Sequence, residues 1–79
     1  MDRNAIFGKV KEYILQQLTI GEDKIVDSAR MIEDLGADSA NLMMLIMDLE
    51  TEFNMTVEDE ALGTVKTVGD IVDYIAKKG

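Results

Sequence analysis

A stripe of large apolar side chains in the middle of the chain limits the fold more than any other sequence feature. Its members stand at positions i, i+3, i+4, i+7 and i+11, the spacing that places side chains on one face of an α-helix. They are Leu42, Leu45, Ile46, Leu49 and Phe53. We therefore predict a central helix that begins at Ser39 and is ended by Asn54.

Two further segments have the amphipathic pattern of helices. Residues 5–18 repeat an apolar side chain every fourth position, and residues 68–79 repeat them at i, i+3, i+4 and i+7. The apolar positions are Ile6, Val10, Ile14 and Leu18 in the first segment and Val68, Ile71, Val72 and Ile75 in the last. Both segments are predicted to be long helices.

Capping-box spacing predicts where two helices begin. In this motif a hydroxyl residue is followed three positions later by an acid, and each side chain bonds to the other's backbone N–H. Thr67 and Asp70 have this spacing at the start of the last helix. Thr56 and Asp59 have it as well, before a segment that Gly63 would stop, so we expect a short helix there.

Residues 19–38 form a long connection between the first and the central helix. Their apolar residues lack a regular period, and structureless loops of this length are uncommon in compact domains. We expect the apolar residues to pin this loop across the core; the alternative is a turn of helix that the pattern does not reveal. The chain is thus predicted to be all-α, a small four-helix bundle of three long helices and one short helix with a long loop between the first two.

Charge and composition exclude several classes of function. The 16 acidic and 8 basic residues give a net charge of −8, which repels nucleic acid and anionic lipid and favours a basic protein partner. The absence of cysteine and histidine removes disulfides and the commonest zinc-binding sets, so no metal site is expected. The N-terminal region mixes charged with apolar residues and is neither a signal peptide nor a membrane span. We expect a monomeric, cytoplasmic protein that does not insert into membranes.

Ser39 follows an acidic, glycine-containing stretch and precedes the central helix, where several roles compete. A serine nucleophile needs a base, usually histidine, and the chain has none, so we do not expect an enzyme. Asp38 or Ser39 could simply cap the helix. Free N–H groups and the helix dipole also favour an attached phosphate at this position, which suits a modified serine.

A calcium-binding loop of the EF-hand type does not fit this stretch. The sixth position from Asp34 is Ser39 in place of glycine, and the twelfth is Leu45 in place of glutamate.

Three stretches of sequence together point to a family of carrier proteins. They are DLGADS at 34–39, DLETEF at 48–53 and TVGDIVDYI at 67–75. In this combination the chain resembles acyl carrier proteins of the bacterial fatty-acid type over nearly its whole length, as a single acyl-carrier-like domain of residues 1–79. The resemblance implies that Ser39, beside Asp38, accepts 4'-phosphopantetheine from coenzyme A through a phosphopantetheinyl transferase. It also implies that the thiol of this arm carries acyl groups as thioesters to acyl synthesis or acyl transfer enzymes.

Two alternatives stay open at this point. The stretch GADS at 36–39 resembles the fatty-acid type more than the GGDS common among peptidyl carriers, so a single residue separates this reading from an aminoacyl or peptidyl carrier. The other alternative is an unmodified helical adaptor that binds a basic protein partner, in which Ser39 is only a cap.

An apolar pocket for the acyl chain is expected between the central helix, the long loop and the last two helices, as the resemblance also implies. The predicted lining residues are Met31, Ile32, Leu45, Leu49, Val57, Leu62, Val65 and Ile71. Each methylene buried in such a pocket contributes roughly 0.8 kcal/mol.

The central helix departs from the family pattern at three positions, two of which lie on the face opposite its apolar stripe. Ala40 stands where the family usually has leucine, and Asn41 and Met44 stand where acids are common. A helical projection places three methionines on this face, which we interpret as an exposed, adaptable patch for partner enzymes of a specialised variant. The predicted partner interface comprises Ala40, Met43, Met44, Met47, Asp48 and Thr51. The alternative is that these methionines are buried, under the long loop or in a dimer interface.

Overall fold

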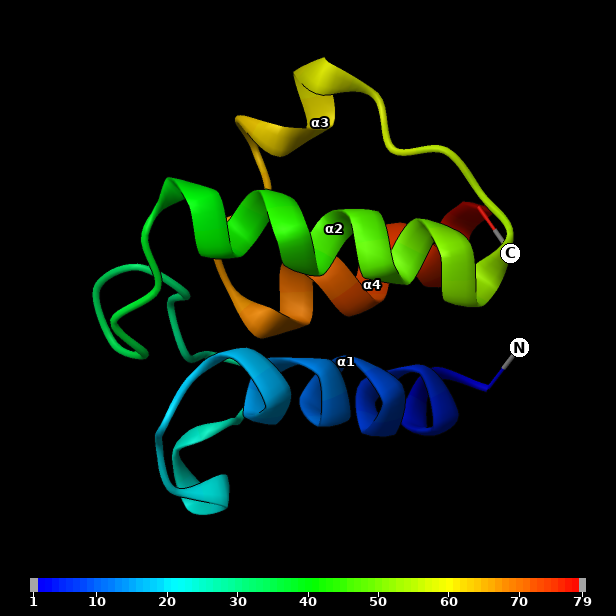
Figure 1. Cartoon of the computed structure of the whole chain (residues 1–79). Helices are drawn as coiled ribbons and strands as arrows, with labels where there is room; N and C mark the ends of the chain where they lie inside the picture. The colour runs from blue at the N-terminus through cyan, green and yellow to red at the C-terminus, as the bar shows by residue number, and fades with distance from the viewer. Residues whose placement is uncertain (1, 79) are drawn as a thin grey trace.

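Three long helices and one short helix make up the fold (Figure 1). The computed structural model describes residues 2–78, with the exception of the Asp59 side chain. In chain order the elements are α1 (Arg3–Gln17), the 3₁₀ turn η1 (Glu22–Lys24), α2 (Ser39–Phe53), α3 (Asp59–Leu62) and α4 (Val68–Lys78). Within the described residues there is no β-strand, and no helix is long and apolar enough to cross a membrane. The all-α prediction, with three long helices and one short one, is confirmed.

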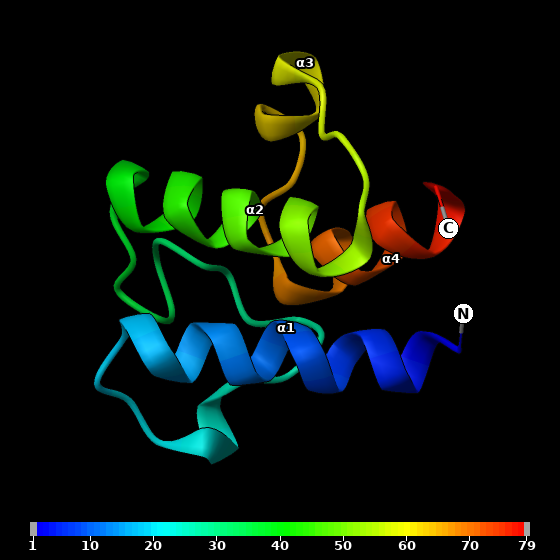
Figure 2. The same cartoon turned by 45° about the vertical axis from the view of Figure 1, so that its right-hand side comes forward.

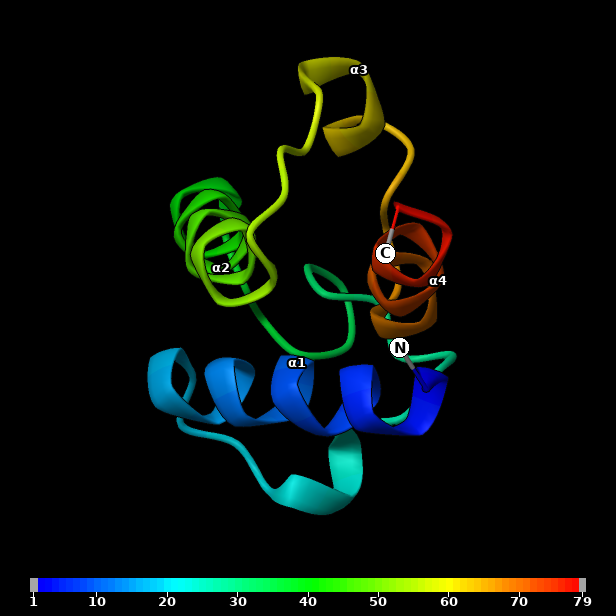
Figure 3. The same ribbon diagram turned by 90° about the vertical axis from the view of Figure 1, so that its right-hand side faces the viewer.

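Helix α1 packs against both α2 and α4, and α3 lies on the opposite side of the bundle. Figure 3 views α2 and α4 nearly end-on, with α1 crossing beneath both. The short α3 lies at the top of the same view, and Figure 2 shows it in the same position relative to α2. The segments on either side of α3 therefore cover the side of the bundle that α1 leaves open.

The core is built from the apolar faces that the sequence pattern assigned to the three long helices. Its helical members are Ile6, Val10 and Ile14 of α1, Leu45 and Leu49 of α2, and Val68, Ile71, Val72 and Ile75 of α4. Leu42 and Phe53, the two ends of the stripe on α2, are only partly buried. No polar or charged side chain is buried among the described residues, so apolar burial is the main source of stability.

The long connection is pinned across this core, as predicted, and it also contains the turn η1. Ile25, Met31 and Leu35 are buried in the core. Val26 and Ile32 are 47% and 54% exposed, so these two apolar residues of the loop do not help to pin it to the core. An irregular backbone has no repeat that would direct every apolar side chain to the same side.

Backbone hydrogen bonds tie this loop to the segment that leads into α4. The N–H of Met31 donates to the carbonyl of Lys66 at 3.0 Å, and the N–H of Gly69 donates to the carbonyl of Asp27 at 2.9 Å. A Cβ atom added at position 69 would lie 2.9 Å from the same Asp27 oxygen. Glycine at position 69 therefore permits the close approach of the loop to α4.

Side-chain caps, and not the apolar period, decide where the helices begin. Helix α1 spans residues 3–17 instead of the predicted 5–18, because Asp2 caps it, accepting a hydrogen bond from the Asn4 N–H at 3.3 Å. The predicted capping box of α4 is present: the Asp70 N–H donates to Thr67 Oγ1 at 3.0 Å, and the Thr67 N–H donates to the Asp70 carboxylate at 3.1 Å. The backbone N–H groups of Thr67 and Lys66 hold the pKa of Asp70 below its ordinary value of 3.8.

The capping box predicted at Thr56 is wrong. Helix α3 begins at Asp59, and the residue at its N-cap position is Glu58, which makes no side-chain cap. The Asp59 side chain, the other half of the predicted box, lies outside the described residues. The Val57 N–H donates to Glu50 Oε2 at 2.8 Å, so a carboxylate of α2 holds this segment in place of a local cap.

The two helix stops lie at the predicted residues. Asn54 has φ +51, a left-handed conformation, and ends α2. Beyond it, the Met55 N–H donates to the Glu50 carbonyl at 3.0 Å. Gly63 follows Leu62, the last residue of α3, but in a right-handed conformation with φ −74.

Candidate functional site

Residues 35–39 form a tight turn that presents one exposed hydroxyl at the start of α2. Leu35 and Ala37 are buried and attach the turn to the core. Gly36 between them has φ +76, a left-handed conformation that residues with a side chain rarely adopt. Asp38 precedes the helix, and Ser39 is its first residue. The stretch LGADS thus combines two anchors, a glycine turn, a cap and a hydroxyl.

Asp38, and not Ser39, caps α2. The Asn41 N–H donates to Asp38 Oδ1 at 2.8 Å, and the Asp38 N–H donates to Asn41 Oδ1 at 3.2 Å. These two bonds form a reciprocal capping box. The reading in which Ser39 is merely the cap of the central helix is therefore wrong for this chain.

The cap leaves the hydroxyl of Ser39 free. Ser39 is exposed, and within residues 2–78 its hydroxyl takes part in no hydrogen bond. The other serine of the chain, Ser28, is also exposed but lies in a turn of the long loop, away from any helix start. Free backbone N–H groups and the positive end of the helix dipole favour a phosphate on Ser39 and not on Ser28.

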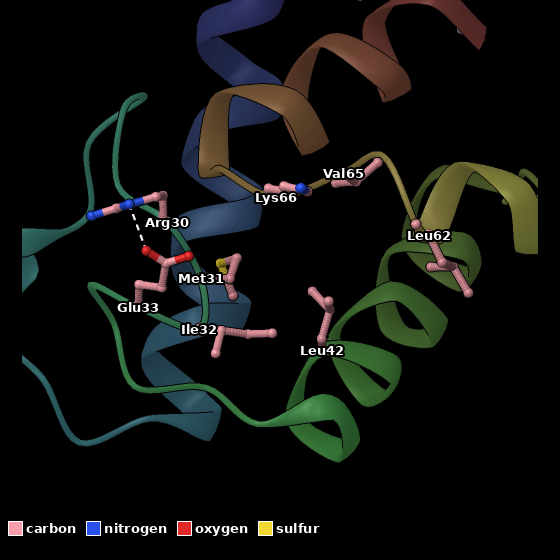
Figure 4. Close-up of a pocket in the computed structure, with 9 residues that line it drawn as sticks. Arg30, Met31, Ile32, Glu33, Leu42, Leu62, Val65 and Lys66 are labelled. Atoms are coloured by element: carbon pink, nitrogen blue, oxygen red, sulfur yellow. Dashed lines mark ion pairs between the residues drawn. The ribbon is translucent and has the colours of Figure 1, made fainter.

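A cavity of about 270 Å³ lies between the long loop, α2 and the segment after α3 (Figure 4). Its lining residues are Arg30, Met31, Ile32, Glu33, Leu42, Leu62, Gly63, Val65 and Lys66. Leu42 lies three residues after Ser39, so the two side chains share one side of α2, one turn apart. The cavity is therefore close to the free hydroxyl.

The predicted pocket residues are divided between this cavity and the packed core. Met31, Ile32, Leu62 and Val65 line the cavity. Leu49, Val57 and Ile71 line a separate space of only about 10 Å³, which also touches Val65. Leu45 lies away from both spaces, and its side chain is 1% exposed.

Leu42 and the charged rim of the cavity are lining features beyond those predicted from the sequence. Leu42 belongs to the apolar stripe and was assigned to the core, although its position next to Ser39 could have indicated a lining role. At the rim, the Arg30 guanidinium pairs with Glu33 and Asp34, and Figure 4 shows it turned toward Glu33. Two hydrogen bonds lower the pKa of Asp34: the larger effect comes from the Arg30 backbone N–H and the smaller from the Arg30 side chain. Lys66, in contrast, forms no ion pair with a described side chain.

The methionines of α2 face outward, so their burial under the loop is ruled out. Met43, Met44 and Met47, which we call the methionine face, are 47%, 57% and 60% exposed. The rest of the predicted partner interface, Ala40, Asp48 and Thr51, is exposed as well. Between α1 and α2, the Tyr13 hydroxyl donates to Glu52 Oε1 at 2.6 Å, which raises the pKa of Tyr13.

Comparison with known proteins places this chain in a family. A family model for the phosphopantetheine attachment site matches residues 8–75. The chain belongs to this phosphopantetheine attachment-site family. The acyl carrier protein of Thermotoga maritima is 49% identical over 76 residues, which cover 96% of this chain and 94% of that protein. The acyl carrier protein of Bdellovibrio bacteriovorus is 44% identical over 75 residues, covering 95% of this chain and 96% of that protein.

A solved structure agrees with the fold. The acyl carrier protein from Enterococcus faecalis superposes with a TM-score of 0.85 at 34% identity, and the match covers 100% of both chains. The start of α2 also fits the group that gives the family its name, because attachment of a phosphate group needs an exposed hydroxyl. The Asp38–Asn41 capping box leaves the exposed hydroxyl of Ser39 free for such a group.

Proposed function

We propose that this chain carries acyl groups on a 4'-phosphopantetheine arm attached to Ser39. The observation that carries the proposal is the exposed Ser39 hydroxyl, free of the capping box formed by Asp38 and Asn41. When attached, the arm supplies a terminal thiol that holds an acyl group as a thioester. The names of the relatives and the family match over residues 8–75 support the same role.

The residues around Ser39 prepare it to be modified by another protein. Gly36 and the buried Leu35 and Ala37 fix the turn, and Asp38 secures the first turn of α2. The chain has no histidine that could activate the hydroxyl, so a phosphopantetheinyl transferase must supply the base. The chain is therefore a substrate and a carrier, and not a catalyst. We place this exchange in the cytoplasm, because a chain without cysteine has no need of an oxidising compartment.

The cavity beside Leu42 is proposed to shelter the part of the acyl chain nearest the thioester. Its apolar lining is supplied by Met31, Ile32, Leu42, Leu62 and Val65. Burial of each methylene there contributes roughly 0.8 kcal/mol. Val65 also borders the small space next to Leu49 and Ile71, so its side chain is the wall that a longer acyl chain would have to pass.

The methionine face is proposed to meet the enzymes that load and use the arm. It begins one helical turn after Ser39 and is flanked by the exposed acid Asp48. Thioether side chains adapt to differently shaped apolar surfaces, and the net charge of −8 attracts basic ones. Partners with an apolar groove and a basic rim therefore fit this face best, whether they synthesise or transfer acyl groups.

A modification assay tests the attachment site. The unmodified chain is incubated with coenzyme A and a phosphopantetheinyl transferase, and its intact mass is measured. We expect the wild type and the control Ser28→Ala to gain the mass of one arm and Ser39→Ala to gain none. A gain by Ser39→Ala would move the site elsewhere, and no gain by the wild type would favour an unmodified helical adaptor.

A further inference from the structure

Among the described residues, the methionines that are exposed are gathered on the methionine face. Met47 is four residues from Met43 and three from Met44, so the three side chains are neighbours on the helix surface. The other exposed large apolar residues are Leu15, Val26 and Ile32, which lie on other segments and contain no sulfur. Leucine would give the docking surface similar apolar area, and thioethers differ from leucine in being open to oxidation.

Two other methionines provide a contrast within the same chain. Met31 is buried in the core with 2% exposure. Met55 is partly buried and packs against the core. Because oxidation of methionine follows access to its sulfur, an oxidant in solution should reach the three residues of the methionine face before it reaches these two.

We infer that the methionine face is a site of reversible oxidation that weakens docking of the enzymes acting on Ser39. In the reaction with a peroxide, the thioether sulfur attacks one peroxide oxygen and the O–O bond breaks as an S–O bond forms. The remaining oxygen leaves as hydroxide, and the oxygen now bound to sulfur gives up its proton, which the hydroxide takes up to form water. The sulfur loses two electrons, and the peroxide gains them. In the reverse direction two thiols are oxidised to a disulfide while the sulfoxide oxygen leaves as water, a reaction that methionine sulfoxide reductases catalyse.

Oxidation of the methionine face should affect the enzymes that act on Ser39, because the face lies next to this residue. This step rests on the proposed function of Ser39. Met43 lies four residues after Ser39, one helical turn away. An enzyme that reaches Ser39 along α2 must therefore cover the methionine face. A sulfoxide adds a polar S–O group, which loses its water when an apolar surface covers it, and burial of an unpaired polar group is unfavourable. Oxidation should therefore weaken the encounter without any change in the core.

The unmodified chain is the right material for the test, because it contains neither a cysteine nor the arm thiol. Peroxide is added in increments, the reaction is stopped, and peptide mapping measures sulfoxide at positions 43, 44, 47, 55 and 31. The rate of arm attachment by a phosphopantetheinyl transferase is then measured at low chain concentration. We expect Met43, Met44 and Met47 to be oxidised first. As these three residues are oxidised, the rate of arm attachment should fall roughly tenfold. A methionine sulfoxide reductase should restore the rate.

A triple variant separates the face from the other methionines. Met43→Leu/Met44→Leu/Met47→Leu keeps the apolar area and removes the sulfur, so its rate after peroxide should equal its own rate before peroxide. Met55→Leu, the matched control, should lose rate on oxidation as the wild type does. Equal oxidation of Met31 and the methionine face, an unchanged rate after oxidation, or a triple variant as sensitive as the wild type would overturn the inference. Failure of the untreated wild type to accept the arm would instead overturn the proposed function.

Discussion

The Asp38 carboxylate accepts a hydrogen bond from the backbone N–H of Asn41 at 2.8 Å, and the Asn41 side-chain oxygen accepts one from the Asp38 N–H at 3.2 Å. This reciprocal pair satisfies the start of α2 without using Ser39. Asp38 thus caps the helix, while the neighbouring Ser39 stays free for the proposed attachment, and stability and modification experiments can separate the two roles.

Removal of the Asp38 cap should lower the free energy of unfolding, whereas removal of the proposed attachment site, Ser39, should leave it almost unchanged. Asp38→Ala removes the acceptor for the Asn41 N–H and should lower the free energy of unfolding by about 1 kcal/mol. Ser39→Ala removes a free hydroxyl and should change it by less than about 0.5 kcal/mol. Urea unfolding followed by circular dichroism measures both. A larger loss for Ser39→Ala than for Asp38→Ala would contradict the assignment of the cap.

Two glycine-to-alanine substitutions should have opposite effects on stability. A Cβ at position 69 would lie 2.9 Å from the Asp27 carbonyl oxygen, so Gly69→Ala should destabilise the fold by roughly 1–3 kcal/mol through overpacking. Nothing lies within 4 Å of a Cβ added at position 8, on α1, so Gly8→Ala should stabilise by roughly 0.5–1 kcal/mol. Thermal unfolding of the two variants provides the comparison. A stable Gly69→Ala protein would mean that the loop does not approach α4 so closely.

Stability should fall in acid because of the capping box of α4. The backbone N–H groups of Thr67 and Lys66 hold the pKa of Asp70 below the ordinary value of 3.8, so the ionised carboxylate favours the folded state. Its contribution is present above pH 3.8 and is lost as the pH falls through the lower pKa of the folded state. Urea unfolding at a series of pH values measures this loss. We expect the free energy of unfolding of Asp70→Asn to depend less steeply on pH than that of the wild type. An equally steep dependence would contradict a stabilising role for the ionised Asp70 carboxylate.

The side chain of Val65 should limit the length of acyl chain that the fold can shelter. In the wild type, the melting temperature of the loaded protein should rise with chain length and then level off, since each buried methylene contributes roughly 0.8 kcal/mol. Val65→Ala opens the wall between the cavity and the space next to Leu49, so its melting temperature, relative to the unloaded variant, should level off at a longer chain. The same limit in both proteins would show that Val65 is not the barrier.

Charge substitutions at adjacent positions of α2 should separate the exposed face from the core. Met44 is 57% exposed and Leu45 is 1% exposed. Met44→Glu should change the free energy of unfolding by less than about 0.5 kcal/mol, whereas Leu45→Glu places a charge in the core and should prevent stable folding. Met44→Glu should also favour partners with basic patches over partners with apolar grooves, as competition binding would measure. Strong destabilisation by Met44→Glu would contradict an exposed methionine face.

The helices were predictable because their apolar faces are periodic. The stripe from Leu42 to Phe53 and the repeat from Ile6 to Ile14 fix which sides of α1 and α2 meet the core, and the structure agrees. The boundaries depend on single hydrogen bonds. Helix α1 begins earlier than predicted because Asp2 accepts a hydrogen bond from the Asn4 N–H. Before α3, the Val57 N–H donates to the carboxylate of Glu50 on α2 instead of to a local cap. Capping spacing alone cannot reveal such a long-range partner.

The residues of the candidate site also differ in how well the sequence predicts their surroundings. Ser39 and Asp38 lie in a contiguous motif, so their neighbourhood follows from the sequence. The cavity joins the loop after Arg30 to the segment after Leu62, and only the folded chain brings these together. For this reason the rim cannot be predicted from the sequence, and the predicted lining residue Leu45 instead packs into the core. Loop residues such as Ile32 have no period from which their direction could be predicted.

Tandem mass spectrometry of the protein isolated from its own host tests the central claim most directly. Fragmentation of the intact, unreduced protein locates any modification and measures the mass of an attached acyl group. We expect a phosphopantetheine arm on Ser39, with an acyl group in thioester linkage that hydroxylamine removes. An unmodified Ser39, or an arm on Ser28, would contradict the assignment of this chain as an acyl carrier that uses the free hydroxyl at the start of α2.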